Sequence, residues 1–338
     1  MGIFVGKSTH RPHGRYCLAT ALPNVDITTD INDEITRLLS WADTWLIDLN
    51  PTKTKCMNIT TAHIKITPSP SFNGTPIEMV DSHKHLGLVI NTSLTWNDHI
   101  DYTMDKVSKR IGILRMLKHR LTRSCLRTIY VTHIRSVLEY CDVVWDGCQA
   151  YNALALERLQ CDCIRIITGL PIFCRLDNLY RESGFDTLTE RRRQHRLILL
   201  YKTAILGKAP SYFKDLLTEL RNDPTVRGYR HVMTFAPYPI TDSMTYLKTF
   251  FPATTKEWNS LDVGCRRAPS LSTFKFLIRP VPIAIPPLKE LPRYPSILYT
   301  RLKYACSGLN AHLNHSNIIP SPLCACATGV EDLWYEAG

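Results

Sequence analysis

Basic side chains crowd the segment from residue 106 to residue 127, where they could contact the phosphates of a nucleic acid. Lys106, Lys109, Arg110 and Lys118 are the main candidates. Apolar residues recur through the same region at helical spacing, namely at Met104, Val107, Ile111, Leu114, Leu117 and Leu121. The pattern predicts a helix with one buried face and a basic remainder. Such charges either bind phosphates or are simply solvated, and the spacing alone leaves both interpretations open.

The chain as a whole is also basic. Among its 338 residues, 41 are Lys or Arg and 30 are Asp or Glu, which gives a formal net charge of +11. A balance of this size favours a polyanionic partner, most simply nucleic acid, and the alternative is a basic but inert surface. Hydrophobic residues make up 44% and charged residues 21%, which indicates a globular protein with room for two or three domains.

The cysteines and the N-terminal residues indicate in which cellular compartment the protein is found. The 12 cysteines are too irregularly spaced, in too long a chain, for a secreted disulfide scaffold. The start of the chain is too short an apolar run for a signal peptide, and no stretch approaches the ~20 apolar residues of a membrane span. We therefore expect an intracellular protein, cytoplasmic or nuclear, with reduced thiols, no membrane association and no small-molecule substrate.

The sequence of residues 29–100 predicts one amphipathic helix followed by a small antiparallel sheet. The helix begins at Thr29 or Asp30 and stops at Asn50-Pro51. Its apolar face would comprise Ile31, Ile35, Leu38, Ala42, Trp45 and Leu49. Strand-like segments follow and are separated by Pro, Asn and Gly turns, at residues 53–60, 63–67, 77–80 and 85–90.

The rest of the chain predicts a mainly helical protein, so the expected fold class is α+β with α predominating. Residues 1–28 are expected to be irregular and residues 101–220 helical. In the packed region 221–282, Trp258 and Phe274 are the expected anchors. Proline fixes φ and removes N–H donors, so residues 283–298 are expected to form a linker. A cysteine-containing tail follows at 299–338.

Four motifs in the first half carry a family resemblance. They are W-A-D-T-W at 41–45, L-N-P-T-K-T at 49–54, H-K-H-L-G-L at 83–88 and L-T-W-N-D-H-I at 94–100. In this order and spacing they resemble the end of the palm domain of reverse transcriptases from non-LTR retrotransposons. The resemblance continues through L-E-Y at 138–140, the F-P-x-T and W-N-x-L pieces of 251–261, and the tail, so that it spans about residues 30–335.

This resemblance implies roles for particular residues. Lys53 would belong to the palm motif near the incoming nucleotide, and Leu86-Gly87 to the motif that grips the primer end. The basic helix would be the thumb, with phosphate contacts from Lys106, Lys109, Arg110 and Lys118 to an RNA or RNA–DNA duplex. Arg191–Arg193 is a weaker candidate, because one helix turn cannot aim three consecutive side chains at one partner. The sequence gives no oligomeric state.

The catalytic carboxylates of the family have no counterpart in this sequence. The family holds two Mg²⁺ ions with a Tyr/Phe-Ala-Asp-Asp hairpin, which the resemblance places near residues 8–14. Those residues read S-T-H-R-P-H-G, and no Asp or Glu precedes Asp26. Asp30 and Asp33 are better explained by the start of a helix, where carboxylates favour the helix dipole. We therefore expect a catalytically inactive fragment with no cofactor of its own.

The tail contains Cys324 and Cys326, two residues of what in the family is a plausible zinc set. Trp334-Tyr335 stands where the family has His-Tyr. His312 or His315 could complete a site in principle, but Cys-x-Cys alone is a weak zinc signal. We expect free thiols here and no bound zinc.

Three interpretations of the whole chain follow. The first is a reverse-transcriptase remnant with residual affinity for a nucleic-acid duplex. The second is an adapted, non-enzymatic helical module that binds nucleic acid or protein, and the same residues would serve it. The third is a relic without a selected function, in which half a palm leaves exposed sheet edges that favour aggregation.

Overall fold

The computed structural model describes residues 2–7, 15–20, 27–47, 49–59, 69–72, 74–208, 217, 235, 244–280, 292–306 and 313. They belong to two compact units, residues 1–102 and 103–338, and each unit is described by itself. The fold is mainly helical with small sheets, as the sequence predicts. Among the described helices, none combines the length and the apolar character that crossing a membrane requires.

The first unit contains a four-stranded sheet in the order β2-β1-β3-β6. Its strands are β1 (Gly2–Lys7), β2 (Arg15–Thr20), β3 (Lys55–Asn58) and β6 (Glu78–Met79). β1 is antiparallel to both β2 and β3, whereas β3 and β6 are parallel, so the sheet is mixed and not purely antiparallel. The hairpin of β1 and β2 also corrects the expectation that residues 1–28 are irregular. Because β1 pairs with β3, the edge of β3 that faces β1 is not open to solvent.

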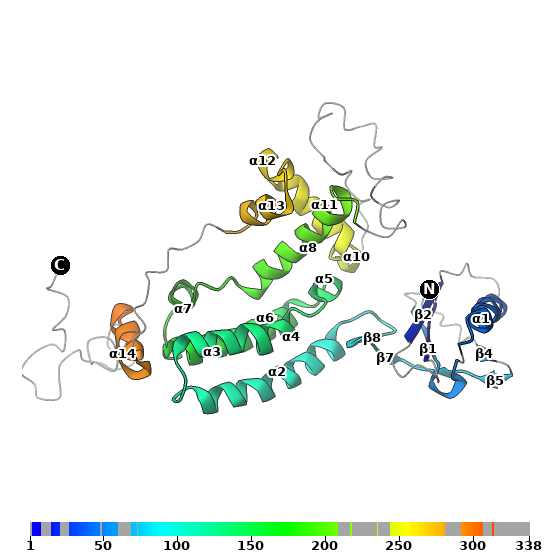
Figure 1. The fold of residues 1–338 in the computed structure, drawn as a ribbon, viewed down its shortest axis with the longest axis horizontal. Coiled ribbons are helices and arrows are strands. Elements are labelled where there is room, and N and C mark those ends of the chain that lie inside the picture. Colours follow the sequence, from blue (N-terminus) through cyan, green and yellow to red (C-terminus); the bar gives the residue numbers. More distant parts are fainter. Residues whose placement is uncertain are drawn as a thin grey trace, which may run out of the picture. The chain divides into compact units, whose positions relative to one another are not determined.

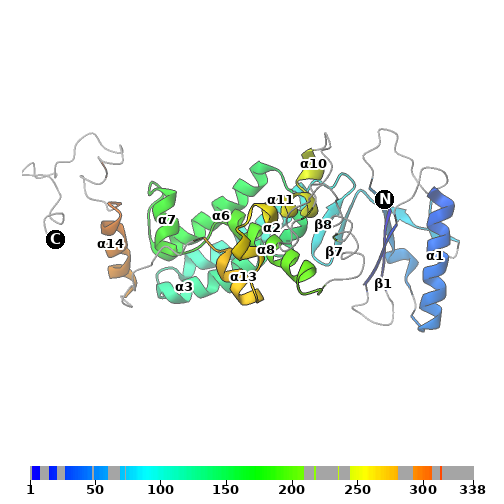
Figure 2. The ribbon, with the colours of Figure 1, turned by 90° about the horizontal axis from the view of Figure 1, so that it is seen from above.

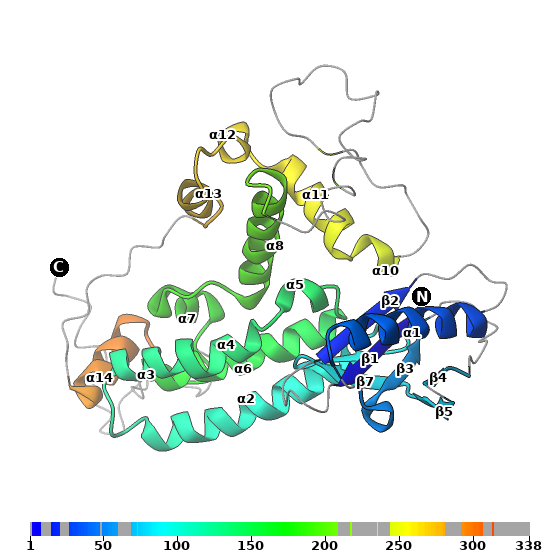
Figure 3. The ribbon, with the colours of Figure 1, turned by 45° about the vertical axis from the view of Figure 1, so that its right-hand side comes forward.

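Helix α1 (Ile27–Thr44) packs against this sheet (Figure 2; Figure 3). Ile31, Ile35 and Ala42 are buried with residues of β3 and β4, as their spacing predicts. The helix ends earlier than expected, because Leu46 adopts a left-handed φ of 50° and the Ile47 N–H donates to the Ala42 carbonyl at 2.9 Å. Trp45 therefore leaves the apolar face, with 65% of its surface exposed, which corrects the prediction that it is buried.

Two short hairpins complete the first unit. β4 (Ser71–Phe72) pairs with β5 (Thr75–Pro76), and β7 (Ser82–His85) pairs with β8 (Leu88–Asn91), both antiparallel. The segment 85–90, predicted as one strand, is thus divided by a turn. The segment predicted as a strand at residues 63–67 lies outside the described residues.

The described part of the second unit is helical, which agrees with the helices predicted for residues 101–208; residues 209–220, also predicted to be helical, lie outside the described residues apart from residue 217. Helix α2 (Asn97–Leu117) begins in the first unit and continues into the second. The next helical run is α3 (Arg123–Ile129), a π-helical segment (Tyr130–Arg135) and α4 (Ser136–Leu138). The remaining described helices are α5 (Asp142–Trp145), α6 (Ala150–Thr168), α7 (Leu176–Ser183), α8 (Leu188–Ala204), α10 (Met244–Leu247), α11 (Phe250–Ser260), α12 (Val263–Arg266), α13 (Leu271–Leu277) and α14 (Arg293–Lys303).

An aromatic cluster joins α8 to α11 and α13, which lie beside it in Figure 1. The Tyr201 ring stacks on Phe274 with centroids 4.5 Å apart, and Trp258 approaches Phe274 at 5.5 Å. Trp258 and Phe274 are both 0% exposed. The prediction that these two residues anchor the region after residue 221 is therefore confirmed.

Helix α14 docks on the ends of two other helices. The Arg293 guanidinium donates to the backbone carbonyls of Lys118, Ile166 and Ile167. These carbonyls lie at the C-terminal ends of α2 and α6, where helical partners are missing and a cation is favoured. Because α14 begins at Arg293, it runs through the boundary that the proline content predicts at residue 298.

Candidate nucleic-acid interface

Lys53 ends a 3₁₀ turn, Pro51–Lys53, whose backbone is held by Asn50. The Asn50 side-chain oxygen accepts from the Lys53 N–H at 3.2 Å, and the Asn50 carbonyl accepts from the Thr54 hydroxyl at 2.8 Å. Thr54 is buried, whereas the Lys53 side chain is exposed. The N-P-T-K-T motif thus presents one ammonium group to solvent at a defined point directly before β3.

Leu86 and Gly87 form the two-residue turn between β7 and β8. Both have positive φ, 46° and 93°, which is the geometry of a type I′ turn and favours Asn-Gly over Leu-Gly. A left-handed conformation costs a residue with a Cβ about 1 kcal/mol. Leu86 is also 59% exposed, so it gains little from burial. A strained, exposed apolar side chain at a hairpin tip is the kind of outlier that points to a functional contact.

The L-T-W-N-D-H-I motif anchors this hairpin to the first turns of α2. His99 is 3% exposed, and its Nδ1 faces the Val89 N–H of β8 at 3.4 Å. The Asn91 side chain accepts from the Thr95 N–H at 3.0 Å and donates to the Asp98 carboxylate at 3.2 Å. The motif therefore fixes the base of the hairpin that carries Leu86 at its tip.

We expect Leu86→Asn to raise the free energy of unfolding by about 0.5–1 kcal/mol, because Asn tolerates the left-handed conformation better than Leu. If Leu86 contacts a primer end, the same change lowers duplex affinity, so stability and affinity move in opposite directions. Leu94→Asn is the matched control, since Leu94 also has a positive φ, 51°, and is 42% exposed. It should stabilise the chain without changing affinity. Denaturant unfolding and fluorescence anisotropy measure the two effects, and an unaltered affinity of Leu86→Asn would remove Leu86 from the interface.

In the second unit, Lys109 is the most accessible of the four predicted phosphate ligands. Its side chain is 76% exposed and pairs with Asp105 at 2.9 Å, one turn earlier on α2. An exposed pair of this kind contributes only about 0.3–0.5 kcal/mol, so it can be exchanged for a phosphate. Lys106 and Lys118 are half-buried, and the Lys118 carbonyl accepts from Arg293 Nε at 3.0 Å.

Arg110 has a structural contact. Its guanidinium donates to the carbonyl of His133, which lies in the π-helical segment after α3. Single π turns often occur at functional sites, and here the contact fastens α2 to the neighbouring helical run. Replacing Arg110 would therefore disturb helix packing together with any phosphate contact. A π turn has no compositional signal, so the sequence did not predict this role.

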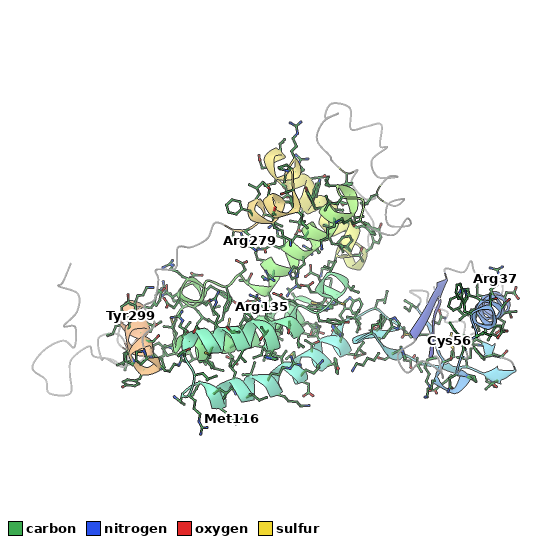
Figure 4. The ribbon with its side chains drawn as sticks, in the orientation of Figure 1. Arg37, Cys56, Met116, Arg135, Arg279 and Tyr299 are labelled. Carbon is green, nitrogen blue, oxygen red and sulfur yellow. The ribbon has the colours of Figure 1, made fainter. Side chains whose placement is uncertain are left out.

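The outward face of α2 is open around Gly112. A Cβ added at Gly112 would meet no heavy atom within 4 Å. Ile113 is 51% and Met116 71% exposed, and Figure 4 shows Met116 pointing away from the neighbouring helices. Arg115 is 61% exposed and lies 3.8 Å from Asp162 of α6. Because glycine lets another backbone approach closely, this face can lie against a sugar–phosphate backbone, with Lys109 and Arg115 beside it. The charge pattern of the sequence gives no sign that Gly112 leaves this space.

Arg191, Arg192 and Arg193 each pair with a carboxylate of the second unit. Arg191 makes a two-pronged pair with Glu139, at 2.7 and 2.9 Å, and Arg192 Nε donates to Asp146 at 2.6 Å. Arg193 pairs with a glutamate one turn earlier at 2.9 Å. The Glu139 pair raises the pKa of Arg191 and keeps it charged. The L-E-Y motif therefore supplies the carboxylate that neutralises the first arginine of this run.

The four residues considered as zinc ligands, for which free thiols and no bound zinc are expected, lie outside the described part of the chain, namely Cys324, Cys326, His312 and His315. Within the described part, no three His, Cys, Asp or Glu side chains are placed to hold a metal ion. Cys161 and Cys163 of α6 are 5% and 0% exposed. Burial raises the pKa of Cys163 to about 12, which suits an inert thiol in a core.

Comparisons with known proteins find distant similarity to transposon polymerases. The probable RNA-directed DNA polymerase from transposon BS of Drosophila melanogaster is 25% identical over 170 residues, which are 49% of this chain and 19% of that protein. The RNA-directed DNA polymerases from mobile element jockey match over 174 residues, at 26% identity in D. melanogaster and 25% in Drosophila funebris. Those matches cover 48% and 50% of this chain, and 18% and 19% of the relatives.

The matched region thus spans about a fifth of the length of these relatives. No protein-family model and no solved structure matches the chain. Over about half of its length, the chain is distantly similar to RNA-directed DNA polymerases of non-LTR retrotransposons.

Proposed function

We propose that the chain is the palm edge and thumb of a retroelement reverse transcriptase, and that it binds an RNA or RNA–DNA duplex. The distant similarity to transposon polymerases supports the family. The observation that carries the binding role is the turn at Leu86-Gly87, where a leucine is held both strained and exposed. Lys53, on its rigid turn in the same unit, supplies a cation for the nucleotide phosphates.

In the second unit, the outward face of α2 is the thumb surface of this proposal. Gly112 leaves room for a sugar–phosphate backbone. Lys109 precedes it by about one helical turn and Arg115 follows it by about one turn. Phosphate contacts of this kind position a duplex without reading its sequence. Lys106 and Lys118 remain candidate ligands at the two ends of the same helix segment.

On this proposal, these 338 residues bind a duplex without extending a primer. The β1–β2 hairpin is joined by residues 8–14, S-T-H-R-P-H-G, which carry no carboxylate. Divalent magnesium in polymerase sites is held by carboxylates, so this segment does not fit the metal pair of the family. We assign no catalytic step to the chain.

Salt dependence tests the proposal. Wild-type affinity for a fluorescent RNA–DNA duplex should fall by orders of magnitude between about 50 and 200 mM salt, because bound phosphates release counterions. Lys109→Ala/Arg115→Ala should reduce the log–log slope by about 2, one for each lost contact. Lys275→Ala/Arg279→Ala removes the same charge from exposed positions on and after α13, and should leave the slope unchanged.

The exposed Ile113 and Met116 favour a second candidate, a helical module that docks on protein. The same titration separates the two functions. If the folded wild type fails to bind the duplex at about 50 mM salt, where phosphate contacts are strongest, the thumb proposal is overturned and the α2 face is left to protein binding or to solvent.

A further inference from the structure

Two cysteines far apart in the sequence meet where α14 docks. Cys174 lies in the loop between α6 and α7, and Cys306 follows the end of α14. The Cys174 thiol donates to the Arg175 carbonyl at 3.8 Å and the Cys306 thiol to the Tyr304 carbonyl at 3.1 Å, and Cys306 is close enough to raise the pKa of Cys174. Cys174 is 4% and Cys306 6% exposed. Two neighbouring buried thiols of this kind are candidates for one disulfide.

Hydrogen bonds fix the backbone at both cysteines. The Cys174 N–H donates to the Pro171 carbonyl at 3.2 Å, and the Cys306 N–H donates to the Arg301 carbonyl at 2.8 Å. The Arg301 side chain in turn donates to the Gly169 carbonyl at 2.8 Å. The loop that carries Cys174 and the helix end that carries Cys306 are therefore tied together beside the thiols.

Close packing at Gly169 also brings α14 against the end of α6, beside the loop that carries Cys174. Gly169 has a φ of +80°, and a Cβ added to it would lie 2.5 Å from Ile297 Cγ1 of α14. Only glycine permits this approach of α14 to the end of α6. The thiol contact thus belongs to a specifically packed interface.

A cation without a full set of partners lies next to the pair. Arg165 Nε is buried and has no hydrogen-bond partner among the described residues, and its charge acts on Cys174. The pKa of Cys174 is raised to about 12, first by burial and then by the contact with Cys306, and Arg165 opposes both effects. The docked pair therefore reacts slowly, and Arg165 stabilises a thiolate once one forms.

We propose that Cys174 and Cys306 are a redox modification site, at which an oxidised low-molecular-weight disulfide such as glutathione disulfide converts the two thiols into one disulfide. One protein thiolate attacks glutathione disulfide, forms a mixed disulfide and releases the first glutathione. The second thiolate then attacks the protein sulfur of that mixed disulfide and releases the second glutathione. The protein loses two electrons and two protons, and both end on two reduced glutathione molecules. The product covalently fastens α14 to the α6–α7 loop.

Peptide mapping of the full chain tests this site. After incubation with glutathione disulfide and digestion without reductant, mass spectrometry should detect a Cys174–Cys306 cross-linked peptide. Oxidation should raise Tm by roughly 5 °C or more, reversibly with dithiothreitol, because the bond closes a long loop.

Variants distinguish the pair from the other thiols. Cys174→Ser and Cys306→Ser should each lose the cross-link and the Tm increase. Cys125→Ser, at an exposed cysteine of α3, should keep both. The wild-type map decides the proposal even if a variant fails to fold. Glutathione left on either cysteine, a bond to another thiol, or a mapped bond without a Tm change would each overturn it.

Discussion

Replacing Glu182 with alanine is expected to lower the free energy of unfolding of the helical unit by about 3–5 kcal/mol. The Glu182 side chain is 1% exposed and accepts from Arg123 at 2.6 Å and from Lys303 at 2.9 Å. It is thus the carboxylate that joins α7 to both α3 and α14. Without it, Arg123 and Lys303 remain partly buried and have no other carboxylate partner in the described part of the chain. Denaturant unfolding followed by far-UV circular dichroism measures the loss.

The same carboxylate should make stability depend on pH. Burial alone would raise the pKa of Glu182, but hydrogen bonds from Lys303 and Arg123 outweigh burial and lower it. A group of this kind contributes stability above its unfolded pKa of about 4.3, and the contribution is lost as the pH falls through the lower folded pKa. Wild type should therefore lose stability below about pH 4 more steeply than Glu182→Gln. Parallel acid profiles would contradict this assignment.

Apolar spacing predicted the buried helix faces well, since burial of one face is what produces the spacing. Val107, Ile111 and Leu114 of α2 are 0–2% exposed, as their positions predict. Trp258 and Phe274 are buried for the same reason. In such cases the burial of each residue can be predicted from the spacing of nearby apolar residues, without knowing which distant residues pack against it.

Helix ends were predicted less well, because they depend on single backbone conformations. α1 ends at a left-handed Leu46, where the usual signal would be glycine. The start of α14 was predicted as part of a linker because prolines surround it. Pro292 precedes the helix and Pro295 lies in its first turn, where a proline is tolerated because the first N–H groups have no helical partner.

Candidate site residues could be named only where the motifs of the family resemblance are local, and their binding roles stay predictions. The turn at Lys53 and the hairpin at Leu86-Gly87 are short and self-contained, so their residues could be named from the sequence. The role of Arg110 could not be, because it depends on the His133 carbonyl of another helix. Charge alone likewise cannot show which carboxylates pair with Arg191–Arg193. Arg191 and Arg192 pair with Glu139 and Asp146, which are distant in the sequence, and Arg193 pairs with Glu190 of the same helix.

Asp146 provides the second large expected effect. Its carboxylate accepts from Arg192 at 2.6 Å and from Arg196, and the side chains of these three residues are 4–12% exposed. Arg196 also pairs with Glu257 of α11 at 2.7 Å. Among the described residues, Asp146→Ala would leave Arg192 with no carboxylate partner and Arg196 with one, so we expect a loss of about 3–5 kcal/mol in the free energy of unfolding.

Asp105→Ala is the matched control, because it removes one carboxylate from an exposed ion pair with Lys109. It should change the free energy of unfolding by no more than about 0.5 kcal/mol. The contrast follows from solvation, since water replaces a lost partner at the surface but cannot reach Arg192. Both variants are measured by the same denaturant titration. Similar small losses for both would mean that the arginines of α8 remain solvated, and Arg191–Arg193 would return as candidate ligands for a polyanion.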